Sequence, residues 1–224
     1  MPRRPIVAID GPAASGKSST ALLVARALGF CHVDSGALYR TMTLLAQEGL
    51  GAAETWSPDA VVAAARARGV AAVPAGVTLD VRVAGRSVGD AIRTEAVTRE
   101  VSRVAAMPAV RDFVNVLLRE AARDGGIVMD GRDIGTVVFP DAEVKVFLVA
   151  EPAERARRRL LERGRPLDAC GLRAEADAIV TRDGRDAGRD VAPLRPASDA
   201  VHIDTTSLSL AEQVRRVVDL VRAA

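Results

Sequence analysis

Short apolar runs alternate with amphipathic segments along most of the chain. Five runs have the length and composition of buried strands: 6–10 (IVAID), 31–34 (CHVD), 127–130 (IVMD), 144–149 (VKVFLV) and 201–204 (VHID). Apolar residues recur at helical spacing over about 17–27, 36–47, 58–68, 94–106 and 108–123, and from Pro152, Leu172 and Ser209 onward. Strands that alternate with helices predict an α/β fold whose parallel sheet is covered on both faces.

Residue types at several predicted helix ends support these boundaries. Gly29 is placed to end the first helix as a C-cap. Ser57 and Pro58 have the order of an N-cap followed by proline at the first helical position. Ser209 and Glu212 form a capping-box pattern ahead of the last helix.

The pattern changes near residue 70. The segments 70–73 (VAAV), 77–83 (VTLDVRV) and 86–89 (RSVG) are short and rich in valine, and Pro-Ala-Gly and Ala-Gly turn signals separate them. They predict a small antiparallel β element inserted between helices.

Composition excludes several classes of protein. The chain has 224 residues, of which 49% are apolar and 27% charged, so it is not a disordered chain. This length suits one compact domain with a sizeable insert. No apolar stretch approaches the roughly 18 residues that span a bilayer. Residues 1–5 (MPRRP) lead straight into the first predicted strand, so we expect no secretory signal.

Net charge and cysteine spacing limit the classes of binding partner that the chain can have. The chain has 31 basic and 29 acidic residues, and a net charge of +2 gives no bulk attraction for nucleic acid or an anionic membrane. The aromatic residues form no stacking stripe for single-stranded nucleic acid. Cys31 and Cys170 have no metal-ligand spacing. We therefore expect small-molecule partners, a reducing compartment, namely the cytoplasm, and no zinc site.

Residues 11–18 (GPAASGKS) match the phosphate-loop pattern G-x-x-x-x-G-K-[ST] between a predicted strand and a predicted helix. In this context, loop N–H groups and the helix N-terminus form an anion site. Lys17 would reach the β- and γ-phosphates, and a hydroxyl would help to hold magnesium. The loop predicts a bound nucleoside triphosphate but does not identify the acceptor.

A second anion site is predicted at the end of the second strand. Ligands bind beyond the carboxyl ends of strands in an open parallel sheet. The second strand ends in DSG (34–36), which places Ser35 and Arg40 beside the phosphate loop. Arg40 could bind a phosphate with two parallel hydrogen bonds, and a solvated helix arginine is the alternative.

The third strand ends in DGRDIGTVVFP (130–140), which suits a polar pocket better than a core. Arg132 could bind a phosphate. An ionised Asp133 can only accept hydrogen bonds, so it would favour a base with an amino group over one with a carbonyl at that position. A turn stabilised by aspartate side chains is the alternative.

Residues 181–190 (TRDGRDAGRD) space Arg182, Arg185 and Arg189 at i, i+3 and i+7, which is one face of a helix, with Asp186 beside them. The two glycines of this segment would weaken the helix by ~1 kcal/mol each. We interpret it as a mobile flap whose arginines stabilise the charge of a transferred phosphoryl group. A solvated helix without a role is the alternative.

No general base stands out. His32 and His202 lie inside predicted strands, so we interpret them as core or edge residues and not as catalysts. An acceptor that carries a phosphate needs no base, because its oxygen is already anionic. The triphosphate loop, the second anion site and the flap together favour a small kinase.

Six segments occur in a characteristic order: IVAIDGPAASGKSS, VDSGALYR, AIRTEAV, VSRVAAMPAVR, DGRDIGTVVFPDAEVKVFL and RDVAPL. In this order they resemble the bacterial cytidylate kinases, a family of the nucleoside monophosphate kinase group of P-loop proteins. The resemblance covers about residues 5–222. It implies ATP-dependent phosphorylation of CMP and dCMP to CDP and dCDP, in pyrimidine nucleotide metabolism.

The resemblance also implies roles for individual residues. ATP would be bound by Gly11, Pro12, Ala13, Ala14, Ser15, Gly16, Lys17, Ser18 and Ser19, with Ser18 or Ser19 contacting Mg²⁺. The CMP site would contain Ser35, Arg40, Ser102, Arg111, Arg132, Asp133, Arg182, Asp186 and Arg189. Ser102, Arg111 and Asp133 would recognise cytosine, and Lys17, Arg132, Arg182 and Arg189 would supply the catalytic charges.

The implied fold is a single P-loop kinase domain with a five-stranded parallel sheet, an enlarged acceptor-binding region and a short lid. The corresponding ranges are a core of about 1–35, 124–153 and 197–224, an acceptor region of about 36–123 with the β insert at about 70–90, and a lid of about 154–190. Segment 164–180 departs from the family pattern, which leaves the roles of Arg155, Arg158 and Arg159 open. We expect a monomer.

Two alternatives remain open from the residues themselves. One is a UMP or shikimate kinase on the same core. Asp133 would repel uracil O4, and an arginine-flanked phosphate site does not suit shikimate. The other is a non-catalytic P-loop sensor that binds ATP, which CMP-dependent release of ADP would exclude.

Overall fold

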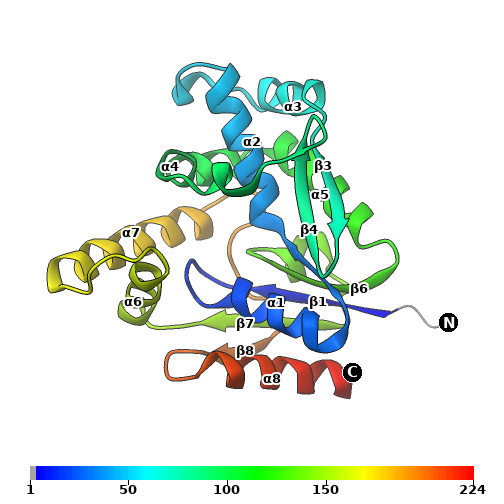
Figure 1. The fold of residues 1–224 in the computed structure, drawn as a ribbon, viewed down its shortest axis with the longest axis vertical. Helices are drawn as coiled ribbons and strands as arrows, with labels where there is room; N and C mark the ends of the chain where they lie inside the picture. The colour runs from blue at the N-terminus through cyan, green and yellow to red at the C-terminus, as the bar shows by residue number, and fades with distance from the viewer. Residues whose placement is uncertain (1–3) are drawn as a thin grey trace.

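The parallel sheet predicted from the five apolar runs is present in the computed structural model, which describes residues 4–224 (Figure 1). Its strands are β1 (Arg4–Asp10), β2 (Cys31–Asp34), β6 (Gly125–Gly131), β7 (Val144–Val149) and β8 (Val201–Asp204), in the order β2-β6-β1-β7-β8. Because β1 is central, the phosphate loop that follows it opens at the middle of the sheet. The expectation of no secretory signal concerns residues 1–5, of which 1–3 lie outside the described residues.

Helices cover both faces of the sheet (Figure 1). They are α1 (Lys17–Leu28), α2 (Ser35–Gly49), α3 (Pro58–Ala67), α4 (Glu95–Val104), α5 (Pro108–Ala121), α6 (Pro152–Glu162), α7 (Ala169–Ala187) and α8 (Leu210–Ala223). Side chains alternate along β1, so that Ile6 and Ala8 pack with α2, α3 and α5, whereas Val7 and Ile9 pack with α1 and α8. Within residues 4–224, no helix is both long enough and apolar enough to cross a membrane.

The predicted helix ends are confirmed. The Ser57 side chain accepts the N–H of Ala60 at the start of α3. Ser209 and Glu212 exchange hydrogen bonds as a capping box at the start of α8. Gly29 follows α1 with a left-handed φ of 66°, which leaves its N–H bonded to the last turn of the helix.

The β insert forms as predicted, and it also joins the core sheet. Its strands are β3 (Ala71–Ala75), β4 (Thr78–Val83) and β5 (Arg86–Ser87), and both of its pairings are antiparallel. β4 continues the sheet beyond β2 through the parallel pair His32 and Thr78. The N–H of His32 donates to the carbonyl of Val77 at 2.8 Å. The result is one mixed sheet of eight strands in the described chain.

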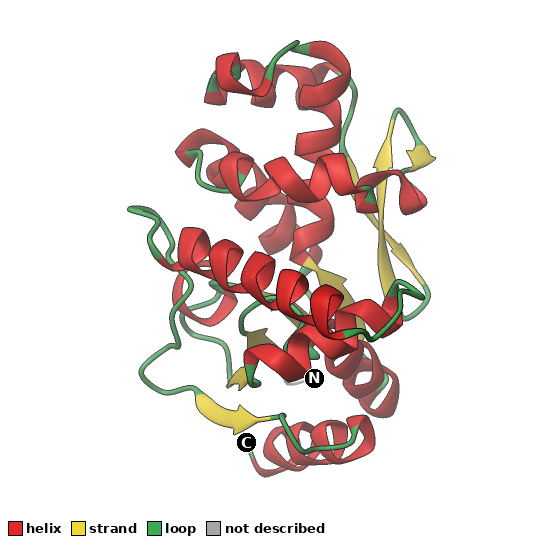
Figure 2. Ribbon diagram, turned by 90° about the vertical axis from the view of Figure 1, so that its left-hand side faces the viewer, coloured by secondary structure: helices red, strands yellow, loops and turns green. Residues whose placement is uncertain are grey.

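Helix α7 differs from the expected flap. Residues 181–187 belong to one continuous helix that begins at Ala169 and crosses the front of the molecule in Figure 2. Burial of Ile179 against the phosphate loop offsets the cost of Gly184 inside the helix. Because the helix ends at Ala187, Arg189 lies beyond it, and the prediction that three arginines share one helical face was wrong.

Candidate active site

A cleft of about 800 Å³ opens where the parallel strands end. Its walls come from the phosphate loop, the start of α2, the segment after β6, and helices α4, α5, α6 and α7. All nine residues expected at the acceptor site line it: Ser35, Arg40, Ser102, Arg111, Arg132, Asp133, Arg182, Asp186 and Arg189. Ala13, Ala14, Gly16, Lys17, Ser18 and Ser19 of the loop line it too, whereas Gly11, Pro12 and Ser15 do not.

The backbone of the phosphate loop requires its glycines. A Cβ at Gly11 would lie 2.2 Å from the carbonyl oxygen of Leu148, so only glycine lets the loop pack against β7. Gly16 has a φ of 91°, in the left-handed region, immediately before α1. Among residues 4–224, no side chain caps the N-terminus of α1. The first N–H groups of this helix are therefore available to an anion.

Lys17 is a buried lysine that lines the cleft. Its ammonium group donates to the carbonyl of Pro12 at 3.0 Å. Burial lowers the pKa of Lys17 to about 7, and the positive charges of Arg132 and Arg182 act in the same direction. A bound phosphate would supply the negative charge that this cluster lacks.

Asp130, at the end of β6, connects the two halves of the cleft. Its Oδ2 accepts the Ser18 hydroxyl at 2.5 Å, and its backbone carbonyl accepts the Ser35 hydroxyl at 2.7 Å. The ring Nε2 of His32 lies 2.7 Å from Oδ1. Burial raises the pKa of this carboxyl, but the hydrogen bond with His32 and the charge of Lys17 outweigh it and hold the pKa below its usual range.

A buried ion pair lies at the acceptor end of the cleft. Arg111 of α5 and Asp133 form a salt bridge, with side chains only 2% and 5% exposed. The Arg111 guanidinium also lies over the ring of Tyr39, 5.4 Å from its centroid, and donates to the carbonyl of Ala105 at 3.1 Å. Burial raises the pKa of Asp133, and the charges of Arg111 and Arg189 act in the opposite sense. The pair offers one fixed acceptor and one fixed donor to a ligand.

Asp133 is positioned by a short helical turn that depends on Asp10. Residues Ile134–Val138 form one π-helical turn directly after Asp133. The two carboxylate oxygens of Asp10 accept the N–H groups of Ile134 and Gly135 at 2.9 and 2.8 Å. Burial raises the pKa of Asp10 to about 6, although both hydrogen bonds lower it. The residue before the phosphate loop thereby fixes the segment that carries Asp133.

The Asp186 carboxylate interacts with three other residues that were predicted to line the acceptor site. It accepts the Ser102 hydroxyl at 2.9 Å and the Arg132 Nε at 3.0 Å, and it forms an ion pair with Arg189. Burial raises the pKa of Asp186, and the three nearby arginines, Arg132, Arg189 and Arg182, outweigh burial so that the pKa is lowered. The Ser102 hydroxyl, expected at the base, is engaged by Asp186 in this structure.

Two further arginines carry charge that the described residues do not fully compensate. Arg40 donates to the Thr98 hydroxyl at 2.9 Å, and burial lowers its pKa to about 10. Burial and the charge of Arg132 lower the pKa of Arg182 to about 9. The Nε of Arg182 is buried and has no hydrogen-bond partner among residues 4–224. These features suit a site that is completed by phosphate groups.

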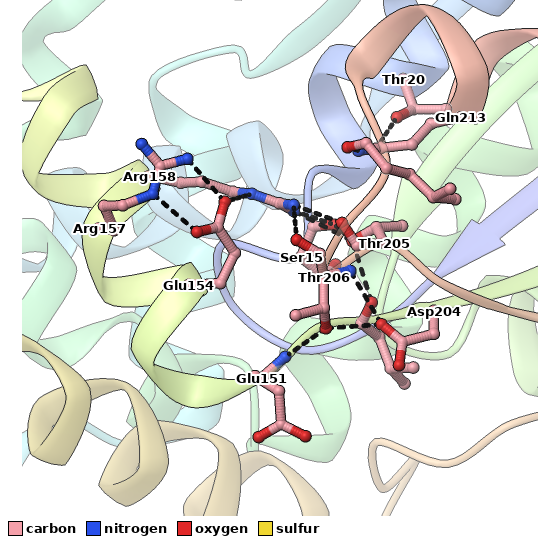
Figure 3. Close-up of polar contacts among 12 residues, drawn as sticks. Ser15, Thr20, Glu151, Glu154, Arg157, Arg158, Asp204, Thr205, Thr206 and Gln213 are labelled. Carbon is pink, nitrogen blue, oxygen red and sulfur yellow. Dashed lines mark hydrogen bonds and ion pairs between the residues drawn. The ribbon is translucent and has the colours of Figure 1, made fainter.

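Arg155, Arg158 and Arg159, whose roles the sequence left open, each form specific contacts in the structure. Arg158 links α6 to the phosphate loop through hydrogen bonds (Figure 3). Its guanidinium donates to Glu154 at 2.8 Å, to the Thr205 hydroxyl at 3.0 Å and to the carbonyl of Ser15 at 3.5 Å. Arg159 pairs with Glu175 of α7 at 3.1 Å and lines the cleft.

Arg155 helps to dock α7 on the phosphate loop. It donates to the carbonyl of Ala13 at 3.1 Å and pairs with Asp183 of α7. Asp183 in turn accepts the N–H of Ala13 at 2.9 Å. The segment 181–187 is therefore in direct contact with the triphosphate-binding loop.

Sequence reasoning assigned no role to several residues that line the cleft. Arg93 ends the 3₁₀ turn Gly89–Arg93 and pairs with Asp34 at 3.2 Å. The sequence signal for Arg93 was its place in AIRTEAV, one of the six segments that resemble the family. Arg185 lines a neighbouring cavity of about 350 Å³ and not the main cleft; its expected approach to the phosphates when both nucleotides are bound stays a prediction.

The described residues contain no cluster of three or more His, Cys, Asp or Glu side chains with the arrangement of a metal site. The hydroxyl of Ser18 beside the carboxylate of Asp130 nonetheless provides oxygen donors of the kind that Mg²⁺ prefers. Both histidines lie in strands as predicted; His32 is buried, and His202 is exposed on β8. Neither histidine lines the cleft.

Comparison with known proteins identifies relatives over nearly the whole chain. Residues 7–223 match the sequence profile of the family described as cytidylate kinase. A cytidylate kinase of Geobacillus kaustophilus (strain HTA426) is 46% identical, with 99% of this chain and 98% of that protein covered. One from Geobacter sulfurreducens is 44% identical over 97% of this chain and 92% of that protein. An uncharacterized protein from Eubacterium ventriosum shares the fold, with a TM-score of 0.52 at 9% identity, over 99% of this chain and 100% of that one.

Proposed function

Since the chain belongs to the cytidylate kinase family, we infer that its reaction is the transfer of the γ-phosphoryl group of ATP to CMP and dCMP. One observation carries this assignment for the cleft. A phosphate loop, a cluster of partly uncompensated arginines and the buried Arg111–Asp133 pair all face the same cavity. The two anion sites suit a donor and an acceptor that both carry phosphate, and the ion pair suits a base.

The donor phosphates would be held by the N-terminus of α1 and by Lys17. The first turn of α1 has N–H groups that no side chain of residues 4–224 caps, and Lys17 would supply a positive charge beside them. Ser18 is the better candidate for the magnesium contact, because its hydroxyl already lies beside Asp130. Bound magnesium would neutralise charge between the β- and γ-phosphates.

The acceptor phosphate would be held by Arg40, Arg132, Arg182 and Arg189. Arg132 and Arg189 are oriented by Asp186, which lies behind them. Positive charges that are fixed before the reaction stabilise the charge that develops on the transferred group. The acceptor oxygen is already anionic, so the chain needs only to align the two nucleotides.

The base would be recognised by the Arg111–Asp133 pair. A carboxylate oxygen of Asp133 can accept from the cytosine amino group, and Arg111 can donate to O2 or N3. Uracil would present an acceptor to Asp133 and a donor to Arg111, and both contacts would be unfavourable. Ser102 would contribute through Asp186, with which it is hydrogen-bonded.

We assign the remaining regions by their place around the cleft. Residues of about 36–123, with the β insert at about 70–90, would bind the acceptor, and residues of about 154–190 would form the lid. The core would comprise about 1–35, 124–153 and 197–224. The protein would act as a monomer, because the two anion sites and the Arg111–Asp133 pair that one chain supplies are sufficient for the proposed reaction.

A coupled assay of ADP release across CMP, dCMP, UMP, AMP and GMP tests this function. We expect rapid ADP release with CMP and dCMP. Release should be far slower with UMP, AMP and GMP. Exposed Arg26 of α1 provides a control, because Arg26→Ala should preserve this preference. Release that does not depend on an acceptor, or a preference for UMP, AMP or GMP, would overturn the assignment.

A further inference from the structure

His32 is a buried residue that the proposed reaction does not use directly. It lies on β2, and its backbone pairs with Val128 of β6 in a parallel register. Paired residues of neighbouring strands point to the same face, so its ring reaches diagonally to Asp130, two residues further along β6. The residue is only 8% exposed, and Asp130 is 1% exposed.

The direction of the hydrogen bond follows from the chemistry of Asp130. Asp130 is buried, and an ionised carboxylate can only accept hydrogen bonds, so the polar groups that face it must be donors. The proton between the two groups therefore belongs to the imidazole, on Nε2. The second oxygen of the same carboxylate is left to accept the Ser18 hydroxyl at 2.5 Å.

One contact thus fixes the orientation of the other. Rotation of the Asp130 carboxylate away from His32 would also move Oδ2 away from Ser18, the hydroxyl at the start of α1. The backbone N–H of His32 is itself held by Val77, at the edge of the β insert. His32 therefore links the insert to the triphosphate loop through two hydrogen bonds from one residue.

We propose that His32 is a positioning residue for phosphoryl transfer, whose Nε2–H holds Asp130 so that its other oxygen orients the Ser18 hydroxyl. This proposal rests on the proposed function for the identity of the reaction. Groups that orient a metal-binding side chain typically contribute about 10–100-fold to metal affinity or activity. The effect should fall on the donor side of the cleft, because Ser35 bonds to the backbone of Asp130 and not to its carboxylate.

Two substitutions separate positioning from packing. His32→Phe keeps a ring in the core and removes the donor, whereas His32→Gln keeps an N–H donor at a similar reach. His202→Phe is the matched control, because His202 is the other histidine of the chain and is exposed on β8. Kinetics with CMP, calorimetry of ADP binding with and without Mg²⁺, and melting temperature are measured for each.

We expect His32→Phe to lower kcat and Mg·ADP affinity by about 10–100-fold while the KM for CMP changes little. His32→Gln should recover most of this loss, and binding of ADP without Mg²⁺ should be unaffected. Unchanged kcat and Mg·ADP affinity in the folded His32→Phe protein would overturn the proposal. Equal losses in both variants, together with a raised KM for CMP, would also overturn it, because a packing defect acts in that way.

Nuclear magnetic resonance tests the contact independently of catalysis and of the folding of any variant. With ¹⁵N-labelled histidine, the wild-type protein contains only two side chains to assign. We expect a slowly exchanging Nε2–H proton from His32 in the nucleotide-free protein. Absence of this proton would overturn the proposal even if CMP kinase activity is present, whereas its presence without CMP kinase activity would overturn only the proposed function.

Discussion

The carboxylate of Asp10 accepts the backbone N–H of Gly135 at 2.8 Å, although 125 positions separate the two residues in the sequence. Asp10 immediately precedes the phosphate loop, and Gly135 belongs to the turn that follows Asp133. A Cβ at Gly135 would lie 3.2 Å from the Lys145 side chain, so the turn is tightly enclosed. The start of the phosphate loop and the proposed base-binding segment therefore fix each other's position through this hydrogen bond.

This arrangement predicts a specific pH dependence of stability for Asp10→Asn. Burial raises the folded-state pKa of Asp10 from 3.8 to about 6. Between these values the native state holds a proton that the unfolded state has lost, so this group's contribution to stability falls as pH rises. The variant lacks that titration. Its free energy of unfolding, relative to the parent, should therefore rise by about 2 kcal/mol between pH 4 and 7.

Urea unfolding at several pH values measures this difference. Asp219→Asn, an exposed carboxylate on α8, controls for the loss of one negative charge. A difference between Asp10→Asn and the parent that stays constant with pH would contradict the assignment.

The buried ion pair predicts the effect of Asp133→Asn on base choice. The amide can rotate to donate to uracil O4, so the variant should lose CMP activity and narrow the CMP-to-UMP ratio of kcat/KM. A site built to hydrogen-bond a substrate group can discriminate by about 10⁴ against an analogue that lacks it. The change also leaves Arg111 buried without its partner, which should cost about 3–5 kcal/mol of stability.

The ratio of kcat/KM values separates these two effects, because lost stability lowers both activities alike. Asp112→Asn, an exposed neighbour of Arg111 on α5, serves as the control. If Asp133→Asn keeps the parental ratio, Asp133 does not read the base.

Lys17→Ala should lower kcat by about 10²–10³-fold, because a lost charge contact costs about 2–4 kcal/mol in the transition state. The melting temperature should be unchanged or higher. Burial lowers the pKa of Lys17, which means that folding disfavours its charged form. Steady-state kinetics and thermal unfolding measure the two quantities. Retained activity, or a large fall in melting temperature, is incompatible with this role.

Docking of α7 on the phosphate loop predicts a ligand-dependent change in hydrogen exchange. Residues 180–190 should exchange more slowly when an ATP analogue and CMP are both bound, because the phosphates would compensate Arg182 and Arg189. Asp183→Ala removes the contact with the Ala13 N–H and should reduce this protection. Helix α3, which does not line the cleft, is the internal control. Unchanged protection of 180–190 with both ligands would argue against a closing lid.

Local patterns in the sequence were sufficient for most of the fold. The five core strands, the capping box at Ser209 and the proline-initiated helices were predicted, because periodicity and capping depend on neighbours in the chain. The phosphate loop is equally local, since its anion site is made by eight consecutive residues and the helix that follows.

Tertiary contacts decided what local propensity could not. Gly184 and Gly188 suggested a weak helix at 181–190, but packing of Ile179 and the hydrogen bonds of Asp183 and Asp186 stabilise α7 through Ala187. The insert appeared separate in the sequence, whereas the free edge of β2 pairs with β4.

The sequence by itself determined which segments are strands and helices, where the triphosphate loop lies and which acceptor residues to expect. Only the tertiary structure decided how those residues are connected: Asp10 to Gly135, His32 to Asp130, and Arg111 to Asp133. Each of these contacts joins residues at least 22 positions apart. Their geometry depends on strand order, register and helix packing, which no short window of sequence encodes.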